Sequence, residues 1–421
     1  MPTLPRMKVG IVGLGYVGLP LAAAFAEAGH DVVGVDSSSA KVERLRRSES
    51  DVVDVSSERL LAMAPRFTAS DDYRKLAGCE AVAICVPTPL TEHREPDLSH
   101  LVNAASGLSR VLHEGRLVVV ESTTYPGTTR ERLAPILEES GLAAGRDFNL
   151  AYSPERIDPG RGPDSIKTTP KLVGGLTDAC RDRAVALYEE VCDEVVGTST
   201  LEAAELAKLL ENVFRSVNIA LVNELAQLCD RLGIDVWEVI DAAATKPFGF
   251  MRFEPGPGMG GHCLPVDPFY LAYKAREHDF YTEFVELAGK INQAQPAFCV
   301  ERISRALNDA RKPVRGSNVL LLGVAYKAGV GDLREAPALR MIELLRERGG
   351  EVGYHDPHVA ELPEQGLSSL DLDEALAETD IVCIVTAHRE VDYERVVERA
   401  PLVLDLRGVT RGIEAANLVR L

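Results

Sequence analysis

The sequence predicts an α/β fold in which two parallel sheets, one toward each end of the chain, are joined by a long central helix. Short apolar strands alternate with helical patterns over the first part of the chain, which is typical of a doubly wound parallel sheet. One helical pattern then covers 201–232 with few breaking residues, a length that suits a spine between domains or subunits. After the linker-like segment 311–316, a second alternation of strands and helices begins.

The predicted elements follow one another in a regular order. Strands of the first sheet are predicted at 8–12, 31–35, 81–86, 117–120 and 148–152. Strands of the second sheet are predicted at 318–324, 351–354, 381–386 and 402–406. Between the sheets, a loop dense in glycine and proline is expected at 247–268, with more helix to about residue 310. We therefore expect three domains, at 1–200, 201–310 and 311–421, of which the second is a helical dimerisation domain.

Charge and composition argue against several classes of partner. A formal net charge of -18 means that most of the surface would repel nucleic acid or an anionic membrane. No segment approaches the roughly 20 apolar residues of a membrane span, and the N-terminal residues lack the apolar core of a signal peptide. The eight cysteines are scattered without a C-x-x-C pair, which indicates reduced thiols rather than disulfides or a zinc site. We expect a cytoplasmic protein that binds no nucleic acid, membrane or metal.

Three glycines directly after the first strand predict a cofactor site. Gly13, Gly15 and Gly18 fit the dinucleotide fingerprint, in which the glycines permit a tight turn, close approach of a pyrophosphate and close helix–strand packing. The helix N-terminus offers unpaired N–H groups to phosphate. Asp36 ends the second strand, can accept hydrogen bonds from ribose hydroxyls and would repel a 2′-phosphate, so NAD is expected rather than NADP. The cofactor residues predicted in this Rossmann-like unit are Gly13, Gly15, Tyr16, Val17, Gly18, Asp36 and Lys41.

A glycine-rich loop later in the chain presents one cysteine. Residues 256–267 read GPGMGGHCLPVD. Glycines at this density let backbone approach a ligand. Cys263, with Asp267 four residues further on, is typical of a nucleophile beside a proton-handling group. An inert, buried loop cysteine is the alternative.

The long helix carries a polar row that favours the catalytic interpretation. Lys208, Asn212 and Arg215 share one helix face by their spacing. Lys208 could stabilise developing negative charge on oxygen, with Asn212 hydrogen-bonding beside it. The alternative is a solvated flank in which Lys208 merely pairs with Glu211.

Two segments that follow strands of the first sheet are further candidates, because ligands of open α/β sheets gather there. The first is 121–128 and the second is 152–160. In the second, Glu155 could act as a base for water and Arg156 could hold substrate. Each segment could equally be loop punctuation with a surface ion pair.

Taken together, these motifs resemble the nucleotide-sugar dehydrogenases, the family of UDP-glucose, UDP-N-acetylmannosamine and UDP-N-acetylglucosamine 6-dehydrogenases. The resemblance covers nearly the whole chain. Besides the fingerprint, the segments that carry it are 86–89, 122–128, 153–160, 205–212, 255–268, 323–327 and 332–335. It implies that 1–200 binds NAD, that 201–310 carries the catalytic loop and that 311–421 is a second Rossmann-like unit, which binds uridine diphosphate.

The resemblance also implies roles for individual residues. Cys263 would be the nucleophile, Lys208 and Asn212 would stabilise oxyanions, Asp267 with a water would handle protons, Glu155 would assist thioester hydrolysis and Thr123 would lie near cofactor and water. Additional cofactor contacts would come from Thr88, Thr124 and Arg334. The implied substrate contacts are Arg156, Ile157, Arg215, Gly256, Gly260 and Lys327.

Residues around the nucleophile favour one branch of the family. His262 stands where glucose-type enzymes usually have Ser or Cys, and Pro247 and Gly249 stand where the mannosamine enzymes often have basic residues. We therefore expect four-electron, NAD-dependent oxidation of the C6 alcohol of UDP-N-acetylglucosamine through a cysteine thioester. Alternatives are the UDP-N-acetylmannosamine or UDP-glucose 6-dehydrogenase activity, a β-hydroxyacid dehydrogenase, and a non-catalytic NAD or redox sensor. The long helix leads us to expect a homodimer or higher homo-oligomer.

Overall fold

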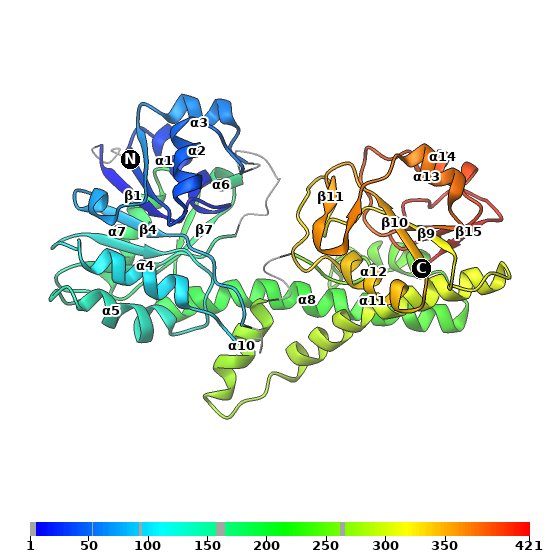
Figure 1. Ribbon diagram of the computed structural model, residues 1–421. Coiled ribbons are helices and arrows are strands. Elements are labelled where there is room, and N and C mark those ends of the chain that lie inside the picture. Colours follow the sequence, from blue (N-terminus) through cyan, green and yellow to red (C-terminus); the bar gives the residue numbers. More distant parts are fainter. Residues whose placement is uncertain (1–5, 53, 92–94, 157–164, 262–265) are drawn as a thin grey trace. The chain divides into compact units, whose positions relative to one another are not determined.

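The computed structural model describes residues 6–52, 54–91, 95–156, 165–261 and 266–421. The contacts within it divide the chain into two compact units (Figure 1). Unit 1 comprises Met1–Glu211 and Phe269–Phe280, and unit 2 comprises Asn212–Pro268 and Tyr281–Leu421. The division into three domains stays a prediction. The boundary between the units at Glu211 and Asn212 falls within α8 (Leu201–Leu232), which begins in one unit and ends in the other.

Unit 1 is built on a sheet that, within its described residues, has eight strands in the order β3-β2-β1-β4-β5-β6-β7-β8. These strands are β1 Lys8–Val12, β2 Asp31–Val35, β3 Phe67–Ser70, β4 Ala81–Ile84, β5 Leu117–Val120, β6 Asn149–Tyr152, β7 Lys171–Gly175 and β8 Val195–Gly197. All pairs are parallel except β6 with β7, which is antiparallel. The sheet therefore departs from the all-parallel arrangement that the sequence analysis expected, and β3, β7 and β8 were not predicted.

Helices cover both faces of this sheet and bury its apolar side chains in two clusters. Alpha-helices α1 (Gly18–Glu27) and α7 (Asp178–Tyr188) contribute to one cluster, for example through Phe25 and Leu187. Helix α4 (Ser99–Ser109) contributes to the other. The other helices that lie wholly or mainly in this unit are α2 Ser39–Arg46, α3 Ser57–Met63, α5 Ala134–Glu138, α6 Ser165–Thr168 and α10 Asp267–Arg276. Because both faces of the sheet are buried, its strands are continuous apolar runs rather than alternating ones.

Unit 2 contains a second sheet, in which the described strands are all parallel and run in the order β10-β9-β13-β14-β15. Its strands are β9 Asn318–Leu322, β10 Glu351–His355, β13 Ile381–Ile384, β14 Val403–Asp405 and β15 Leu418–Arg420, and a separate small ribbon pairs β11 Glu361–Leu362 with β12 Leu367–Ser368. Its helices are α9 Val236–Ala244, α11 Glu283–Asp309, α12 Pro337–Glu347, α13 Leu372–Glu378 and α14 Tyr393–Arg399. One face packs against α8, α9, α11 and α12, and the other against α13 and α14.

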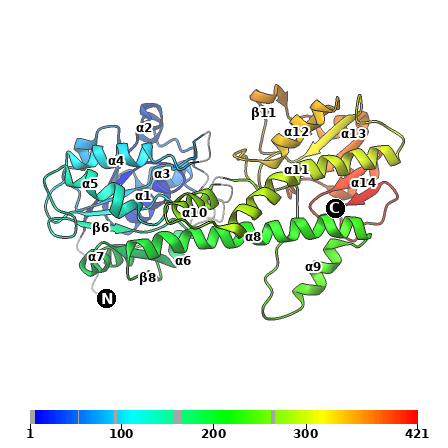
Figure 2. The same ribbon diagram turned by 90° about the horizontal axis from the view of Figure 1, so that it is seen from below.

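The long central helix has the bounds that the sequence predicts, Leu201–Leu232. In unit 2, α11 lies along its C-terminal part (Figure 2). There Gln227 Nε2 donates a hydrogen bond to Gln295 Oε1 at 2.9 Å. The helix predicted up to about residue 310 is two helices, α10 and α11. Asp279 between them has a positive φ of 53°, which an α-helix cannot contain. Among the described residues, no helix is long and apolar enough to cross a membrane.

The predicted α/β fold, with Rossmann-like parallel sheets and a long central helix, is confirmed. In each sheet the carboxyl ends of the parallel strands share one edge, where ligands of such folds bind. In unit 1 that edge also receives the first residue of β7, because β7 runs antiparallel to β6.

Candidate active site

In the cofactor loop after β1, each glycine of the fingerprint has its own structural reason. Gly13 has φ +92°, and a Cβ there would lie 2.6 Å from the Cys85 carbonyl oxygen. A Cβ on Gly18 would lie 1.8 Å from the Gly13 oxygen. Around Gly15, by contrast, no described atom lies within 4 Å of a Cβ position. Gly13 and Gly18 are thus required by internal packing, whereas Gly15 leaves open space on the side where a pyrophosphate would approach.

Asp36 follows β2 beside this loop and is only partly buried. Its carboxylate accepts hydrogen bonds from the backbone N–H of Leu14 and of Ser38, both at 2.9 Å. One oxygen therefore braces the glycine loop while the residue remains accessible to a ribose. Among the other predicted cofactor residues, Tyr16 is exposed and Val17 is the residue before α1.

Two predicted cofactor residues have partners within unit 1. The Lys41 ammonium lies 3.7 Å from the Asp51 carboxylate. Thr88 is buried, and its carbonyl accepts a hydrogen bond from Tyr270 Oη at 2.9 Å. The Lys41 side chain is thus held by an acid of its own unit, and the Thr88 backbone is held by a tyrosine.

A buried glutamate, Glu205, anchors the loop that follows β5. Its carboxylate accepts hydrogen bonds from the Gly127 N–H at 2.6 Å and from the Thr129 N–H at 3.0 Å. Thr124 Oγ1 lies 3.5 Å from it, and Thr124 is fully buried, whereas Thr123 is partly exposed. Burial raises the pKa of Glu205, against these donors. Glu205 begins the 205–212 segment that carries the family resemblance, but no role was predicted for it, although an acidic residue among the apolar positions of a helix is a recognisable signal.

On α8, the solvated-flank interpretation of the polar row is wrong. Lys208 and Asn212 are each only 7% exposed. Glu211, the residue expected to pair with Lys208 in that interpretation, is instead paired with Arg156 at 2.7 Å. Arg215, in contrast, is exposed.

Arg156 is held by protein groups on two sides. Besides the pair with Glu211, its Nη1 donates to the Pro170 carbonyl at 2.6 Å. Glu155, its neighbour, lies 3.8 Å from the Lys171 ammonium. Ile157, predicted to contact substrate, lies outside the described residues.

Asn212 and Asp267 are brought together. Asn212 Nδ2 donates a hydrogen bond to Asp267 Oδ2, and Asp267, the first residue of α10, is 2% exposed. Two residues predicted to handle charge and protons on oxygen are therefore in direct contact in a buried place. Cys263 and its neighbour His262 lie outside the described residues, as do Leu264 and Pro265.

The glycine-rich loop before Cys263 is held by amide side chains. The Gly256 N–H donates to Asn223 Oδ1 at 3.0 Å, and Gln295 Nε2 donates to the Gly256 carbonyl at 3.0 Å. Asn223 in turn donates from Nδ2 to Asn292 Oδ1 at 3.1 Å. These amides were not predicted, because they carry no charge, are not nucleophiles and lie on two helices distant in the chain.

The same loop meets charged and aromatic residues of unit 2. Arg407 Nη1 lies 2.3 Å from the place a Cβ would occupy on Gly256, so this guanidinium stands directly against the loop. At Gly260, a Cβ would lie 2.8 Å from the Glu335 carbonyl oxygen and from Tyr326 Cβ. Arg407 was not predicted as a site residue. Its position just after β14 follows the strand-end rule that identified the other candidates.

Two predicted ligand residues lie in the segment that contacts this loop. The Gly261 N–H donates to the Arg334 carbonyl at 2.9 Å. The Arg334 guanidinium donates from Nε to Asp332 at 3.0 Å. The Lys327 ammonium lies 5.7 Å from the centre of the Tyr326 ring. The glycine-rich loop, Arg334 and the segment of Lys327 are therefore neighbours in unit 2.

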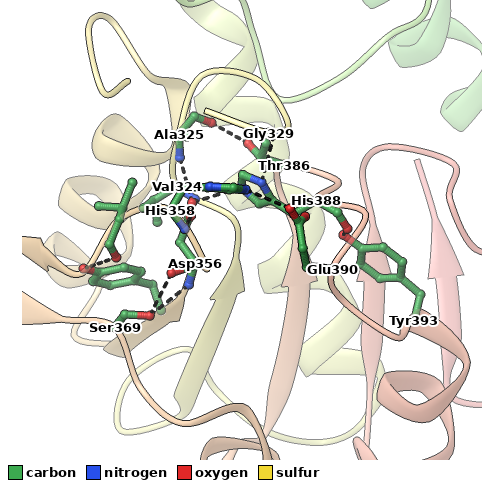
Figure 3. A network of polar contacts seen from close by, with 12 residues as sticks. Val324, Ala325, Gly329, Asp356, His358, Ser369, Thr386, His388, Glu390 and Tyr393 are labelled. Atoms are coloured by element: carbon green, nitrogen blue, oxygen red, sulfur yellow. Dashed lines mark hydrogen bonds and ion pairs between the residues drawn. The ribbon is translucent and has the colours of Figure 1, made fainter. Parts of the chain in front are cut away.

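The second sheet has its own polar network at the carboxyl edge, centred on Asp356 (Figure 3). Asp356 Oδ2 accepts hydrogen bonds from the Val324 N–H at 2.7 Å and the Ala325 N–H at 3.1 Å, and His388 Nε2 lies 3.1 Å from it. Burial opposes ionisation, but His388 and the backbone donors outweigh it and lower the pKa of Asp356 to about 2.

One group of potential metal ligands appears among the described residues. His358, His388 and Glu390 place ligand atoms within 4.8 Å of one another. Both ring nitrogens of His388 are engaged, one with Asp356 and the other with the Gly329 N–H at 3.2 Å. We interpret the group as part of the hydrogen-bonded network around Asp356, because His388 offers no uncommitted nitrogen.

The fold and the site together define a dehydrogenase, with a dinucleotide loop in unit 1 and a buried polar centre on and beside α8. Three segments match successive domains of one family: 7–192 match the NAD binding domain, 202–294 the central domain and 320–412 the UDP binding domain. The chain belongs to the UDP-glucose/GDP-mannose dehydrogenase family. The predicted NAD cofactor and the predicted enzyme class, an NAD-dependent UDP-sugar dehydrogenase, are confirmed.

Individual relatives act on different sugars. The chain is 38% identical to the UDP-N-acetyl-D-glucosamine 6-dehydrogenase of Pseudomonas aeruginosa, over 84% of this chain and 83% of the relative. It is 34% identical to the UDP-N-acetyl-D-mannosamine dehydrogenase of Pyrococcus horikoshii, over 96% and 100%. A solved structure of the UDP-D-ManNAc dehydrogenase from Pyrococcus horikoshii superposes with a TM-score of 0.91, covering 98% of this chain and 99% of that one at 34% identity.

Proposed function

We propose that the protein oxidises the C6 primary alcohol of UDP-N-acetylglucosamine to the carboxylate, in two successive oxidations at one site. The observation that carries the proposal is the buried hydrogen bond between Asn212 and Asp267. It supports a preorganised polar centre four residues from Cys263, with Lys208 buried on the same helix as Asn212. NAD, when bound, accepts the hydride in each oxidation.

The chain's own residues would take the remaining roles. In the first oxidation, a water or Lys208 accepts the hydroxyl proton as the aldehyde forms. The Cys263 thiolate then adds to the aldehyde carbon, and the second oxidation converts this adduct to a thioester. Lys208 and Asn212 stabilise the negative oxygen of each adduct, and Asp267 exchanges protons with water. Finally, Glu155 accepts a proton from the water that hydrolyses the thioester, and the thiolate leaves.

Substrate contacts are proposed on the same basis. The proposed contacts to the sugar nucleotide are Arg156, Ile157, Arg215, Lys327, and Gly256 and Gly260 of the glycine-rich loop. We add Arg407, because its guanidinium lies against Gly256. Arg334 would contact NAD, as would Thr88 and Thr124, and Thr123 would lie near the cofactor and the reacting water. A guanidinium and an ammonium are suited to a diphosphate, which an otherwise acidic protein needs local cations to bind.

The identity of the sugar is the most specific part of the proposed function. Its support is His262 beside the nucleophile, Pro247 and Gly249 in the preceding segment, and 38% identity to a UDP-N-acetyl-D-glucosamine 6-dehydrogenase. NADH production with UDP-N-acetylglucosamine, UDP-N-acetylmannosamine and UDP-glucose, measured side by side, tests it. The highest kcat/KM should belong to UDP-N-acetylglucosamine. One NADH per sugar instead of two would contradict the four-electron reaction and favour a β-hydroxyacid-type dehydrogenase.

Replacing the nucleophile gives the most direct test. In Cys263→Ser, carboxylate formation should fall by about a thousandfold or more, because no thioester can form. NAD affinity should stay unchanged, since Cys263 is outside the dinucleotide loop. Product analysis and NAD titration measure the two effects. Cys299→Ser is the matched control, because that thiol is fully buried in the α11 core. Unaltered carboxylate formation in Cys263→Ser would refute the nucleophile assignment.

We also propose a homodimer formed along the unit 2 part of α8. Its support is a row of exposed apolar side chains there: Phe214 at 46%, Leu221 at 59%, Leu228 at 50% and Leu232 at 61% exposure. A helix face of this kind is expected to be covered by another protein surface. Light scattering on the purified protein measures the mass that decides it.

A further inference from the structure

A second buried ionic cluster lies in unit 1, outside the groups used above. The Lys171 ammonium lies 2.6 Å from Glu121 Oε2, and Tyr188 Oη donates to the other oxygen of the same carboxylate. Glu121 and Tyr188 are fully buried, and the Lys171 side chain is 9% exposed. Such a cluster costs desolvation and is therefore weak evidence of stabilisation by itself.

Sheet topology explains why this lysine reaches the carboxyl edge. Glu121 directly follows β5, and parallel strands deliver such residues to that edge. Lys171 is the first residue of β7, which runs antiparallel to β6 with Tyr152 opposite Gly174. Continuing that register beyond the paired residues places Glu155 opposite Lys171. A parallel strand would bring its last residues to this edge. Because β7 is antiparallel to β6, it brings its first residue, the cationic Lys171, there instead.

The Lys171 ammonium lies between two carboxylates. Besides the contact with Glu121, it is 3.8 Å from Glu155 Oε2. Burial by itself would lower the pKa of Lys171, but Glu121 and Glu155 together hold it above its ordinary value, so the ammonium stays charged. Glu155, Arg156 and Lys171 also line one small recess with Cys192. Glu155 therefore faces a fixed positive charge.

We propose that Lys171 is a positioning residue for Glu155, with Glu121 and Tyr188 fixing the ammonium. This inference rests on the proposed function, in which Glu155 takes a proton from water as the hydroxyl adds to the thioester carbon. The carbon–sulfur bond then breaks, the carboxylic acid forms and the Cys263 thiolate leaves. Lys171 holds the Glu155 carboxylate turned toward one place, and it exchanges no proton in this step. A purely structural ion pair is the alternative.

The test separates hydrolysis from the oxidations before it. The main variant is Lys171→Met combined with Glu121→Gln, because Lys171→Met alone would leave a buried carboxylate without its cation. The amide that Glu121→Gln introduces could still accept the Tyr188 hydrogen bond in place of the carboxylate. Lys171→Arg retains a cation and is the conservative rescue. Lys167→Met is the matched control, since Lys167 is exposed on the segment before β7.

In the double variant we expect the NADH burst of the first turnover to persist and steady-state turnover to fall by about ten- to a hundredfold, as for a misplaced general base. Mass spectrometry of acid-quenched enzyme should show the sugar-nucleotide acyl group on Cys263. Lys171→Arg should recover most of the turnover, and Lys167→Met should behave as the original protein. Thermal unfolding verifies that each variant is folded.

Glu155→Gln distinguishes failure of this inference from failure of the proposed function. It should accumulate the same thioester. If it does, and a folded double variant turns over at the original rate without the adduct, the role of Lys171 is overturned. If neither Glu155→Gln nor the double variant accumulates an adduct, the thioester route itself fails.

Discussion

The two sheets of this protein begin alike at their carboxyl edges. In each, a glycine with positive φ follows the first strand and lies against a carbonyl across the edge. A Cβ on Gly13 would be 2.6 Å from the Cys85 oxygen, and one on Gly323 would be 2.3 Å from the Thr386 oxygen. Each glycine N–H also donates to the last residue of the neighbouring strand, at 2.7 Å and 2.9 Å. The same turn is thus built twice.

The aspartate that follows the second strand makes the difference between them. Asp36 is partly exposed and accepts one N–H of the glycine loop, from Leu14. Asp356 is buried and accepts two, from Val324 and Ala325, besides its contact with His388 (Figure 3). In unit 2 the loop amides are therefore already bonded within the protein and cannot cradle a pyrophosphate.

The helix after the loop differs as well. Helix α1 begins at Gly18, so its N-terminus adjoins the loop, whereas α12 begins only at Pro337. The longer connection of unit 2 carries Lys327 instead. One sheet edge therefore offers N–H groups to a dinucleotide, while the other binds its own N–H groups and presents side chains.

The largest effect should come from breaking the shared turn in one unit at a time. Gly13→Ala and Gly323→Ala each force a Cβ into a backbone carbonyl at positive φ, which should destabilise the protein by about 1–3 kcal/mol or more. Only Gly13→Ala should also abolish NAD binding. Thermal unfolding and NAD titration measure both effects. Gly29→Ala, at φ +99° in open space, is the control for strain without close contact. Loss of NAD binding in a folded Gly323→Ala protein would contradict the comparison.

A medium effect is expected from the buried aspartate, and it depends on pH. The pKa of Asp356 is lowered from 3.8 to about 2 in the folded protein. Its carboxylate therefore stabilises the fold above about pH 4 by about 2 kcal/mol, and this contribution is lost as the pH falls toward 2. Asp356→Asn should be less stable than the original protein at pH 7, with the difference shrinking below pH 4. Urea unfolding at several pH values measures it. Parallel pH curves for the two proteins would disprove the assignment.

The smallest effect is expected from Gly15→Ala. Gly15 stands two residues after Gly13, and the matching position in unit 2, two residues after Gly323, is Ala325. Gly15→Ala has open space and no positive φ, so stability should change by less than about 0.5 kcal/mol. NAD affinity should nevertheless fall by about three- to tenfold, because the added methyl group occupies the approach of the pyrophosphate. Isothermal titration measures the affinity. An unchanged affinity would show that the cofactor does not approach at Gly15.

Much of the fold was predictable because its signals are local. Short apolar runs near glycines predicted β1 and β2. The lack of helix-breaking residues predicted that α8 is continuous. Strand β7 was missed because it ends in two glycines, which are uncommon in strands. Its antiparallel direction could not be predicted from its own residues, since direction depends on where the preceding segment leads the chain.

The candidate site was predictable only where chemistry and sequence spacing coincide. The fingerprint glycines and the Lys208–Asn212 pair are such cases, because a loop motif and a helix face are set by neighbouring residues. Lys171, Asn223 and Arg407 act through contacts with residues far away in the sequence. A neutral amide such as Asn223 carries no signal at all until α8 and α11 are seen side by side.

The amide side chains that hold Gly256 have a consequence for how activity depends on pH and ionic strength. Asn223, Asn292 and Gln295 carry no charge and do not titrate, so acidity cannot switch their contacts and dissolved ions have no charge there to screen. The loop that leads to Cys263 is thus held by neutral groups whose hydrogen bonds depend on neither pH nor ionic strength. Variation of activity with pH or ionic strength should accordingly report on chemistry and substrate capture rather than on the shape of this loop.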